Sequence, residues 1–237
     1  MHMRHLQKLV SLLAVAGLAA ATLPAHATLI EVPLPTLNDS LQNLTNGSNY
    51  PTSGALTVGG IPFTIAQDAN GNNMWATFLL PVPVLDIPVN VFGAVTGYTL
   101  MNSFFGVCGT TIGSVEFKGT GGADVIFNLV EGTNIRDHFT GFFCNTIDPG
   151  TPTMNFGGDV HLDLQTFVLP ASFASETLTH IILTGFKQGG GGEPFITSVT
   201  VQDGVNPAPE PGTLMLLGVG LAAFVSVQRK GRRETAA

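Results

Sequence analysis

The stretch Asp159-Val160-His161-Leu162-Asp163-Leu164 alternates polar and apolar side chains without interruption. Because successive side chains of a β-strand point to opposite faces of a sheet, a period of two predicts a strand. We expect its three aliphatic residues to face a core, and Asp159, His161 and Asp163 to face solvent. The stretch therefore predicts an antiparallel sheet with one buried face.

Short segments of the same kind recur along the chain between turns rich in glycine and proline. Ile61–Ile65 alternates in the same way, and an Asn-Gly turn separates it from Met74–Leu80, so we expect these two segments to form a hairpin. Further strands are predicted at Val89–Phe92, Gly97–Met101, Thr111–Lys118, Ala123–Glu131, Val160–Val168, Thr177–Phe186 and Pro194–Val201. No window of a dozen residues between 28 and 205 shows sustained helical periodicity. The pattern predicts an all-β fold, either a sandwich or a barrel.

Three segments resemble strands of galactose-binding-like β-sandwich domains. Gly54–Phe63 is similar to the early strand pair of these domains, and Tyr98–Asn102 and Phe195–Val201 fit the same pattern. The resemblance is one of pattern, extends over most of residues 28–203 and includes no diagnostic motif. It implies an antiparallel jelly-roll-like β-sandwich and raises the expectation of a carbohydrate-facing fold, but it names no ligand.

Residues 1–27 have the composition of a secretory signal peptide. Arg4 and Lys8 supply the positive start, Leu9–Leu23 is apolar, and Ala25-His26-Ala27 is a small-x-small cleavage site. We expect an N-terminal signal helix that directs the chain to the Sec translocon and is removed after Ala27. The alternative is an uncleaved anchor helix, which the cleavage site disfavours.

The last residues, 206–237, combine three features in a fixed order. Pro209-Glu210-Pro211 lies in a proline-rich spacer, and a short apolar transmembrane helix is predicted at about 213–228. About 15 helical residues rise only about 22 Å, against about 30 Å for a hydrocarbon core, so this anchor is marginal. The positive-inside rule places the basic end in the cytoplasm. That end consists of Arg229, Lys230, Arg232 and Arg233.

This tail resembles the PEP-CTERM sorting signal of Gram-negative bacteria, in which Pro-Glu-Pro precedes an apolar helix and an arginine-rich end. The resemblance extends from Asn206 to the last residue. It implies cleavage near Pro-Glu-Pro by an exosortase, from a precursor anchored in the inner membrane. It also implies a mature protein at the cell surface or in the exopolysaccharide matrix of a biofilm. The alternative is an ordinary C-terminal transmembrane anchor. Residues 28–205 are the predicted exported domain.

The exported part of the chain is markedly acidic. Between residues 28 and 206 it has fourteen acidic residues against three basic ones, Lys118, Arg136 and Lys187. Nucleic acids and anionic membranes bind basic surfaces, so this charge balance argues against both as partners of the domain.

The chain has two cysteines, Cys108 and Cys144, and both lie in the exported part. An even number of cysteines in an oxidising compartment predicts one disulfide. The alternative is a pair of free thiols. A catalytic cysteine is not expected, because no histidine lies in a motif that would mark its partner.

Asp68, Asn70 and Asn72 place oxygen-bearing side chains at alternate positions. Calcium is bound by six to eight oxygens, so this segment is a candidate calcium site. It departs from the calcium loop of helix-loop-helix proteins, because Gly71 is fourth rather than sixth and no glutamate follows at the twelfth position. A plain turn, in which the Asn-Gly pair accommodates positive φ, is the alternative. No other cofactor is predicted.

Asn134, Arg136, Asp137 and His138 form the densest polar group of the domain and include its only arginine. A guanidinium presents a planar fork of donors, so the group could bind a sugar hydroxyl or a carboxylate. Equally, Arg136 and an acidic neighbour could clamp a loop between strands. The sequence leaves both interpretations open.

Two further candidates have simple structural alternatives. Asp159, His161 and Asp163 share one predicted strand face and could bind a metal, or they could be solvated residues of an exposed face. Trp75, the only tryptophan, could stack on a sugar ring or lie in the core.

Three classes of function remain. The first is a non-enzymatic exported protein of the cell surface or exopolysaccharide matrix that binds glycan. The second is a structural or adhesive matrix module that binds protein or itself. The third is an extracellular hydrolase, which would require two carboxyl groups about 5–10 Å apart in a cleft. Because the chain has no Gly-x-Ser-x-Gly and no His-Glu-x-x-His motif, we expect no enzyme.

Overall fold

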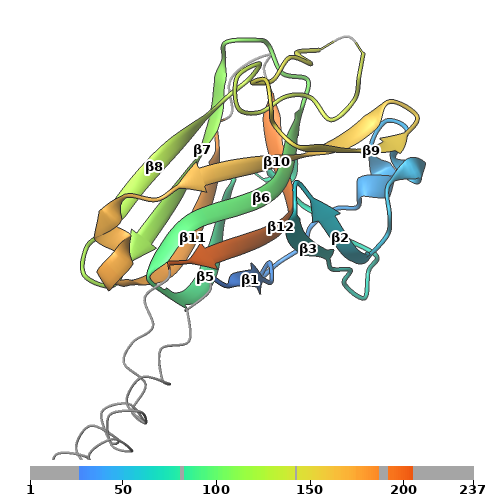
Figure 1. The fold of residues 1–237 in the computed structure, drawn as a ribbon. Coiled ribbons are helices and arrows are strands. Elements are labelled where there is room, and N and C mark those ends of the chain that lie inside the picture. The colour runs from blue at the N-terminus through green and yellow to red at the C-terminus, as the bar shows by residue number, and fades with distance from the viewer. Residues whose placement is uncertain (1–26, 81–82, 142, 187–191, 205–237) are drawn as a thin grey trace, which may run out of the picture. The chain divides into compact units, whose positions relative to one another are not determined.

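Two antiparallel sheets pack against each other, and one of them curls like half a barrel (Figure 1). The computed structural model describes residues 27–80, 83–141, 143–186 and 192–204. The six-stranded sheet has the order β1-β12-β6-β10-β9, with β4 pairing β12 outside this order, and the four-stranded sheet has the order β5-β11-β7-β8. Strands β2 and β3 form a separate hairpin. The strands are β1 (Leu29–Val32), β2 (Gly54–Val58), β3 (Ile61–Ile65), β4 (Trp75–Ala76), β5 (Val84–Phe92), β6 (Ala94–Phe104), β7 (Thr111–Gly119), β8 (Asp124–Val130), β9 (Thr153–Gly157), β10 (Val160–Val168), β11 (Thr177–Gly185) and β12 (Glu193–Asp203).

The described helices are short 3-10 turns: η1 (Leu41–Asn43), η2 (Gly47–Asn49), η3 (Thr77–Leu79) and η4 (Ala171–Ser175). None of the helices in the described ranges is long and apolar enough to cross a membrane. The predicted signal peptide up to residue 26 and the predicted tail, 206–237, lie outside the described residues.

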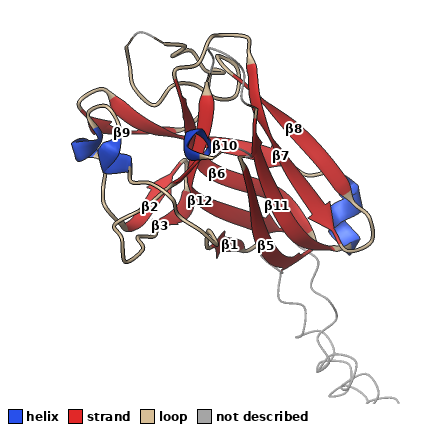
Figure 2. Ribbon diagram, turned by 180° about the vertical axis from the view of Figure 1, so that it is seen from behind, coloured by secondary structure: helices blue, strands red, loops and turns tan. Residues whose placement is uncertain are grey.

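The six-stranded sheet is covered on both faces. One face packs against the four-stranded sheet (Figure 2). The large core between the two sheets includes Phe117, Ile181 and Val199. The other packs against the β2–β3 hairpin and the first two 3-10 turns, through a second core that includes Phe63 and Leu162. This hairpin is also bonded to β12, whose Ser198 and Thr200 hydroxyls donate to backbone carbonyls of β3, at 2.7 and 2.6 Å.

This double cover corrects the prediction for the stretch 159–164. Strand β10 spans Val160–Val168, as predicted, but His161 is only 2% exposed and Asp163 is fully buried. The prediction that they face solvent was wrong, because alternation indicates a solvated face only where nothing covers it. Asp159 precedes the strand, in a turn where its φ is 67°.

The hairpin predicted between Ile61–Ile65 and Met74–Leu80 was also wrong. Strand β3 pairs with β2, as the resemblance of Gly54–Phe63 to an early strand pair implied, while β4 pairs with β12. Trp75 is 3% exposed and packs in the large core between the sheets, where the pairing of β4 with β12 places it. The core alternative for this tryptophan is therefore confirmed. Strands β1 and β9 were not predicted.

Candidate functional site

A pocket of about 260 Å³ lies beside the end of β6, where segments far apart in the sequence meet. Its walls are mainly aromatic. Phe78 comes from η3, Phe104 ends β6, and the other rings come from the loops that follow β6 and β8. The five phenylalanines that line the pocket are Phe78, Phe104, Phe105, Phe139 and Phe143.

A small number of polar groups accompany these rings. Asn43 and Thr45 come from the end of η1, and Glu193 is the first residue of β12. Asp137 and His138, only 2% and 3% exposed, also line the pocket. An apolar pocket with few convergent polar groups is typical of a binding site for a small ligand.

Phe105 is the most unusual residue of the pocket. Its φ is 58°, a conformation that bulky residues rarely adopt, and its side chain is 60% exposed. Its backbone N–H donates to Asp137 Oδ2 at 2.7 Å, and its carbonyl accepts from the N–H of Gly192 at 3.3 Å. Its ring meets that of Phe143 edge to face, with centroids 4.9 Å apart. The protein thus holds an exposed aromatic ring in a strained conformation.

A disulfide joins the two loops that carry these rings. Cys108 and Cys144 are bonded, with Cα atoms 5.1 Å apart, which confirms the prediction. Cys144 also donates its N–H to the carbonyl of Gly106 at 3.0 Å, and its carbonyl accepts from the N–H of Asp137 at 3.0 Å. The crosslink therefore fixes the loop of Phe105 against the loop of Phe143.

Asp137 connects two walls of the pocket. Its Oδ1 accepts from the N–H of Phe139 at 2.8 Å, and its Oδ2 accepts from the N–H of Phe105. Burial raises the pKa of Asp137, although these two hydrogen bonds oppose the shift. Its carboxyl group positions the two aromatic residues.

His138 packs among aromatic rings and is neutral near pH 7. Its Nδ1 lies 3.2 Å from the hydroxyl of Tyr50, which donates to the carbonyl of His161 at 2.9 Å. Its ring centroid is 5.3 Å from that of Phe104. Burial, with a smaller contribution from the charge of His161, lowers the pKa of His138 from 6.5 to about 4.

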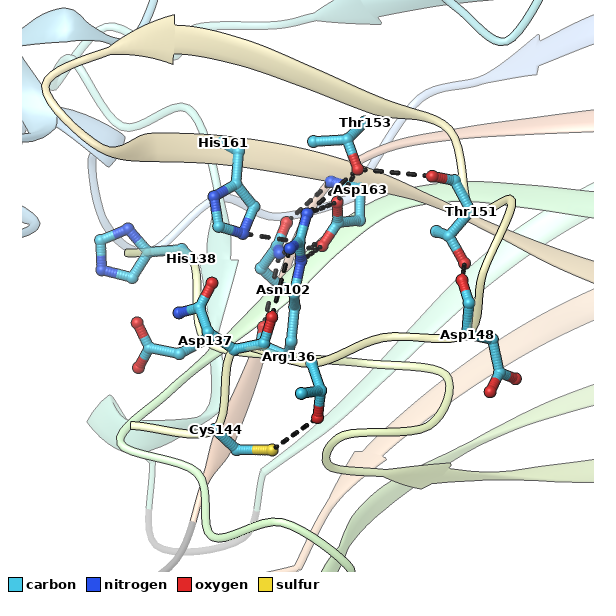
Figure 3. Close-up of polar contacts among 12 residues, drawn as sticks. Asn102, Arg136, Asp137, His138, Cys144, Asp148, Thr151, Thr153, His161 and Asp163 are labelled. Atoms are coloured by element: carbon cyan, nitrogen blue, oxygen red, sulfur yellow. Dashed lines mark hydrogen bonds and ion pairs between the residues drawn. The ribbon is translucent and has the colours of Figure 1, made fainter. Parts of the chain in front are cut away.

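Arg136 belongs to a separate network of polar contacts around the fully buried Asp163 (Figure 3). Its Nε donates to Asp163 Oδ2 at 2.7 Å and its Nη2 to Asp163 Oδ1 at 2.9 Å. It also donates to Thr153 Oγ1 at 3.1 Å and to the carbonyl of Asn145 at 3.3 Å. Asn102 Nδ2 completes the network with a 2.7 Å bond to Asp163 Oδ2. This is the loop clamp of the sequence analysis, although its acid comes from β10 rather than from a sequence neighbour.

The structure therefore divides the predicted ligand-binding group. Asp137 and His138 line the pocket, whereas the donors of Arg136 are committed to the buried network. Asn134 lies in the turn after β8, where its Nδ2 donates to the carbonyl of Asn128 at 2.8 Å and its Oδ1 accepts from the N–H of Val130 at 2.8 Å.

The candidate calcium segment has the geometry of a turn. Asp68 Oδ1 accepts from the backbone N–H groups of Asn70 and Asn72, at 2.8 and 2.9 Å, and its Oδ2 accepts from Asn72 Nδ2 at 2.9 Å. Both carboxylate oxygens of Asp68 therefore accept hydrogen bonds from N–H groups. A calcium ion would need these oxygens, and others beside them, as its ligands. Gly71 takes a φ of 86°, as the turn alternative requires.

Asp163 and His161 do lie close together, with His161 Nε2 3.8 Å from Asp163 Oδ2. Both oxygens of Asp163 are already bonded to Arg136. Across the described ranges, no group of three or more histidine, cysteine, aspartate or glutamate side chains is arranged to hold a metal ion.

The aromatic residues of the pocket and Glu193 were not predicted from the sequence. A signal for the rings was present, because the pairs Phe104-Phe105 and Phe142-Phe143 precede the two cysteines closely. Once a disulfide is predicted, paired phenylalanines beside both of its ends predict aromatic rings close in space.

Comparison with protein families adds one finding, and it concerns the tail. Residues 207–230 match the PEP-CTERM protein-sorting motif. The chain carries a PEP-CTERM sorting signal. The match includes Pro209-Glu210-Pro211 and ends at Lys230, so Arg232 and Arg233 lie beyond it. It implies an exported, membrane-anchored precursor that is processed by an exosortase. Comparison with curated proteins gives no match.

Proposed function

We propose that the chain is a non-catalytic glycan-binding protein of the cell surface or exopolysaccharide matrix of a Gram-negative bacterium. In this proposal the Sec translocon exports it, the signal peptide is removed after Ala27, and the tail anchors it in the inner membrane until the exosortase acts. The sorting motif supports the route. The pocket in the exported domain supports the binding function.

The strand order supports a jelly-roll topology for this domain. Strands β1-β12-β6-β10 form one four-strand layer and β5-β11-β7-β8 the other. From β5 onward the chain crosses between the layers at five of its six successive steps among these strands, and the sixth step is the β7–β8 hairpin. Eight strands in two layers are the jelly-roll arrangement, which lectins use. Because such folds serve many functions, glycan binding has to be inferred from the site itself.

Phe105 is the observation that carries the proposal. A non-glycine residue in the left-handed region costs on the order of 1–3 kcal/mol and persists where its surroundings determine it. Here Asp137 and the disulfide loop hold a ring that remains 60% exposed beside Phe143. Exposure alone does not single out Phe105, because Val168 and Ile126 are at least as exposed. What distinguishes Phe105 is that its ring is held in the wall of an aromatic pocket, where it can stack on the apolar face of a sugar ring.

The test is binding of the full, oxidised chain to oligosaccharides prepared from polysaccharides of its own host, measured by calorimetry. We expect Phe105→Ala combined with Phe143→Ala to weaken binding at least about tenfold, the usual effect of removing central aromatic anchors. Phe92→Ala is the matched control, because Phe92 is 53% exposed on β5, outside the pocket. Failure of the unsubstituted chain to bind any of these polysaccharides, together with self-association that rises with concentration, would instead favour an adhesive module.

A hydrolase is the second candidate, because two carboxyl groups line the same pocket. Burial raises the pKa of Asp137, which suits a general acid, and Glu193 could serve as the second group. This function predicts release of reducing ends from the bound polysaccharide and its loss in Glu193→Gln. Binding without any such release supports the non-catalytic proposal.

A further inference from the structure

The charges at the pocket are all of one sign. Glu193 and Asp137 are its two acidic groups, and burial keeps the third titratable group, His138, neutral near pH 7. The lysine and the arginine that the described ranges contain both form their ion pairs with acids that do not line the pocket. Arg136 bonds Asp163, and Lys118 lies between Glu116 and Asp124, at 2.5 and 3.3 Å. The pocket therefore favours a ligand that brings a positive charge.

Glu193 is the group with which such a charge would pair. Its side chain is half-buried, and within the part of the chain that the structure describes no hydrogen bond or ion pair engages it. Its carboxylate is therefore available to pair with a cation that a ligand brings into the pocket.

The aromatic walls attract the same kind of group. The face of a phenylalanine ring carries negative charge density, so a cation within about 6 Å of a ring centroid is stabilised. Five rings line this pocket, including the edge-to-face pairs Phe78–Phe104 and Phe105–Phe143, with centroids 4.9 Å apart in each. Rings combined with a carboxylate form the cages that bind ammonium groups.

We infer that the pocket binds an amino sugar with a free, positively charged amine, presented by a deacetylated polysaccharide. This inference rests on the proposed glycan binding and specifies its ligand. A volume of about 260 Å³ lies just below the usual range for ligand pockets and suits a single sugar unit. The fourteen acidic residues of the exported domain, against three basic ones, would repel a polyuronate in the same place.

The experiment compares three oligosaccharide probes on the full, oxidised chain: β-1,4-linked glucosamine, its fully N-acetylated counterpart and an oligouronate. We expect the free-amine probe to bind at least about tenfold more tightly than the acetylated one, with an affinity that falls as salt is added. Glu193→Gln, which preserves size, should abolish that preference. Glu31→Gln, an exposed acid on β1, should leave it unchanged.

The outcomes separate this inference from the proposed function. Equal binding of the two glucosamine probes, or preference for the oligouronate, would overturn the amine requirement while leaving glycan binding intact. No binding of any sugar by the unsubstituted chain would overturn both. Tetramethylammonium serves as a fourth probe. If it binds as tightly as the free-amine sugar, the pocket recognises a small cation and the amino-sugar inference is wrong.

Discussion

Asp163 shows how one buried acid can organise a loop. It is fully buried, and its two oxygens accept from Arg136, Asn102 and Thr153. Arg136 in turn bonds the carbonyl of Asn145, in the loop between β8 and β9. This ion pair therefore fixes the loop that carries Phe139 and Phe143 to strand β10.

Removing one partner of this pair should be costly, because it leaves the other charge buried and uncompensated. We expect Arg136→Ala to lower the free energy of unfolding by about 3–5 kcal/mol, measured by urea denaturation. Lys118→Ala is the matched control, because Lys118 forms its ion pairs on the surface, where its side chain is 38% exposed. An effect of Arg136→Ala as small as that of Lys118→Ala would contradict the clamp.

We expect the buried carboxyl group of Glu131 to make the folding stability of the domain depend on pH. It is fully buried, and neither of its carboxyl oxygens has a hydrogen-bond partner among the described residues. The carboxyl group is packed so closely that a Cβ on Gly106 would lie 2.0 Å from its carbon atom. Burial, assisted by the charge of Asp137 and opposed by the Ser103 hydroxyl, raises the pKa of Glu131 from 4.5 to about 8.

The folded chain thus retains a proton at Glu131 that the unfolded chain loses above about pH 4.5, so stability falls as the pH rises from 4.5 to about 8. His138 has the opposite slope between pH 4 and 6.5, because there the unfolded chain holds the extra proton. Above pH 6.5 the opposing slope of His138 has ended, and comparison with Glu131→Gln then measures the part of the fall that comes from Glu131. Over this range we expect the urea midpoint of the unsubstituted chain to fall and that of Glu131→Gln to stay level. Glu31→Gln should retain the full slope, and a slope that persists in Glu131→Gln would exclude Glu131 as its origin.

At the scale of elements, the disulfide holds together the two loops that carry Phe105 and Phe143 into the pocket wall. It closes a separation of 36 residues, for which the loop-entropy model gives a stabilisation of about 4 kcal/mol. Replacing both cysteines by serine should lower the free energy of unfolding by about that amount. It should also weaken glycan binding, because the loops of Phe105 and Phe143 then lose their covalent link and are held by hydrogen bonds alone.

The binding measurement separates the two effects. Below the unfolding transition, the double serine variant should remain folded by circular dichroism and yet bind less tightly. If the folded variant bound with unchanged affinity, the disulfide would stabilise the domain without shaping the pocket.

The elements also show what the sequence can predict. Most strands were predictable because each alternates over its own length, and β10 agrees with its predicted bounds. Pairing was not, because the partner of β4 depends on where Trp75 finds a core, which is a property of the whole fold. The burial of His161 and Asp163 was hidden for the same reason: alternation cannot show that a hairpin covers the second face of the sheet.

The candidate site was predictable only in part. Asp137 and His138 stood out as polar residues within a short segment, and both do line the pocket. Its other residues come from η1, η3, the end of β6 and the start of β12, which meet only after the sheets have formed. A pocket built from five separate segments leaves no local pattern in the sequence.

At the scale of the whole molecule, the described strands all lie between the predicted signal cleavage site and the sorting motif. Strand β1 begins at Leu29, two residues after the predicted signal cleavage, and β12 ends at Asp203, before the spacer that holds Pro209-Glu210-Pro211. These end strands pair with each other, and Asp203 donates its N–H to the carbonyl of Thr28 at 3.1 Å. Processing at either end therefore removes no strand from the sheets.

This arrangement lets the sorting signal be tested without disturbing the domain. Replacing Pro209-Glu210-Pro211 by three alanines should leave a longer chain that stays in the membrane fraction, because the exosortase no longer recognises its site. The measurement is fractionation of host cells with mass spectrometry of the C-terminus. Asn206→Ala, just outside the matched residues, should be processed normally. The unsubstituted chain in a host lacking its exosortase should behave like the triple variant.

If the triple variant were released with the same C-terminus as the unsubstituted chain, the cleavage would depend on something other than Pro-Glu-Pro. Because the domain ends before the spacer, the retained precursor should still bind glycan with unchanged affinity, which separates a failure of sorting from a failure of folding.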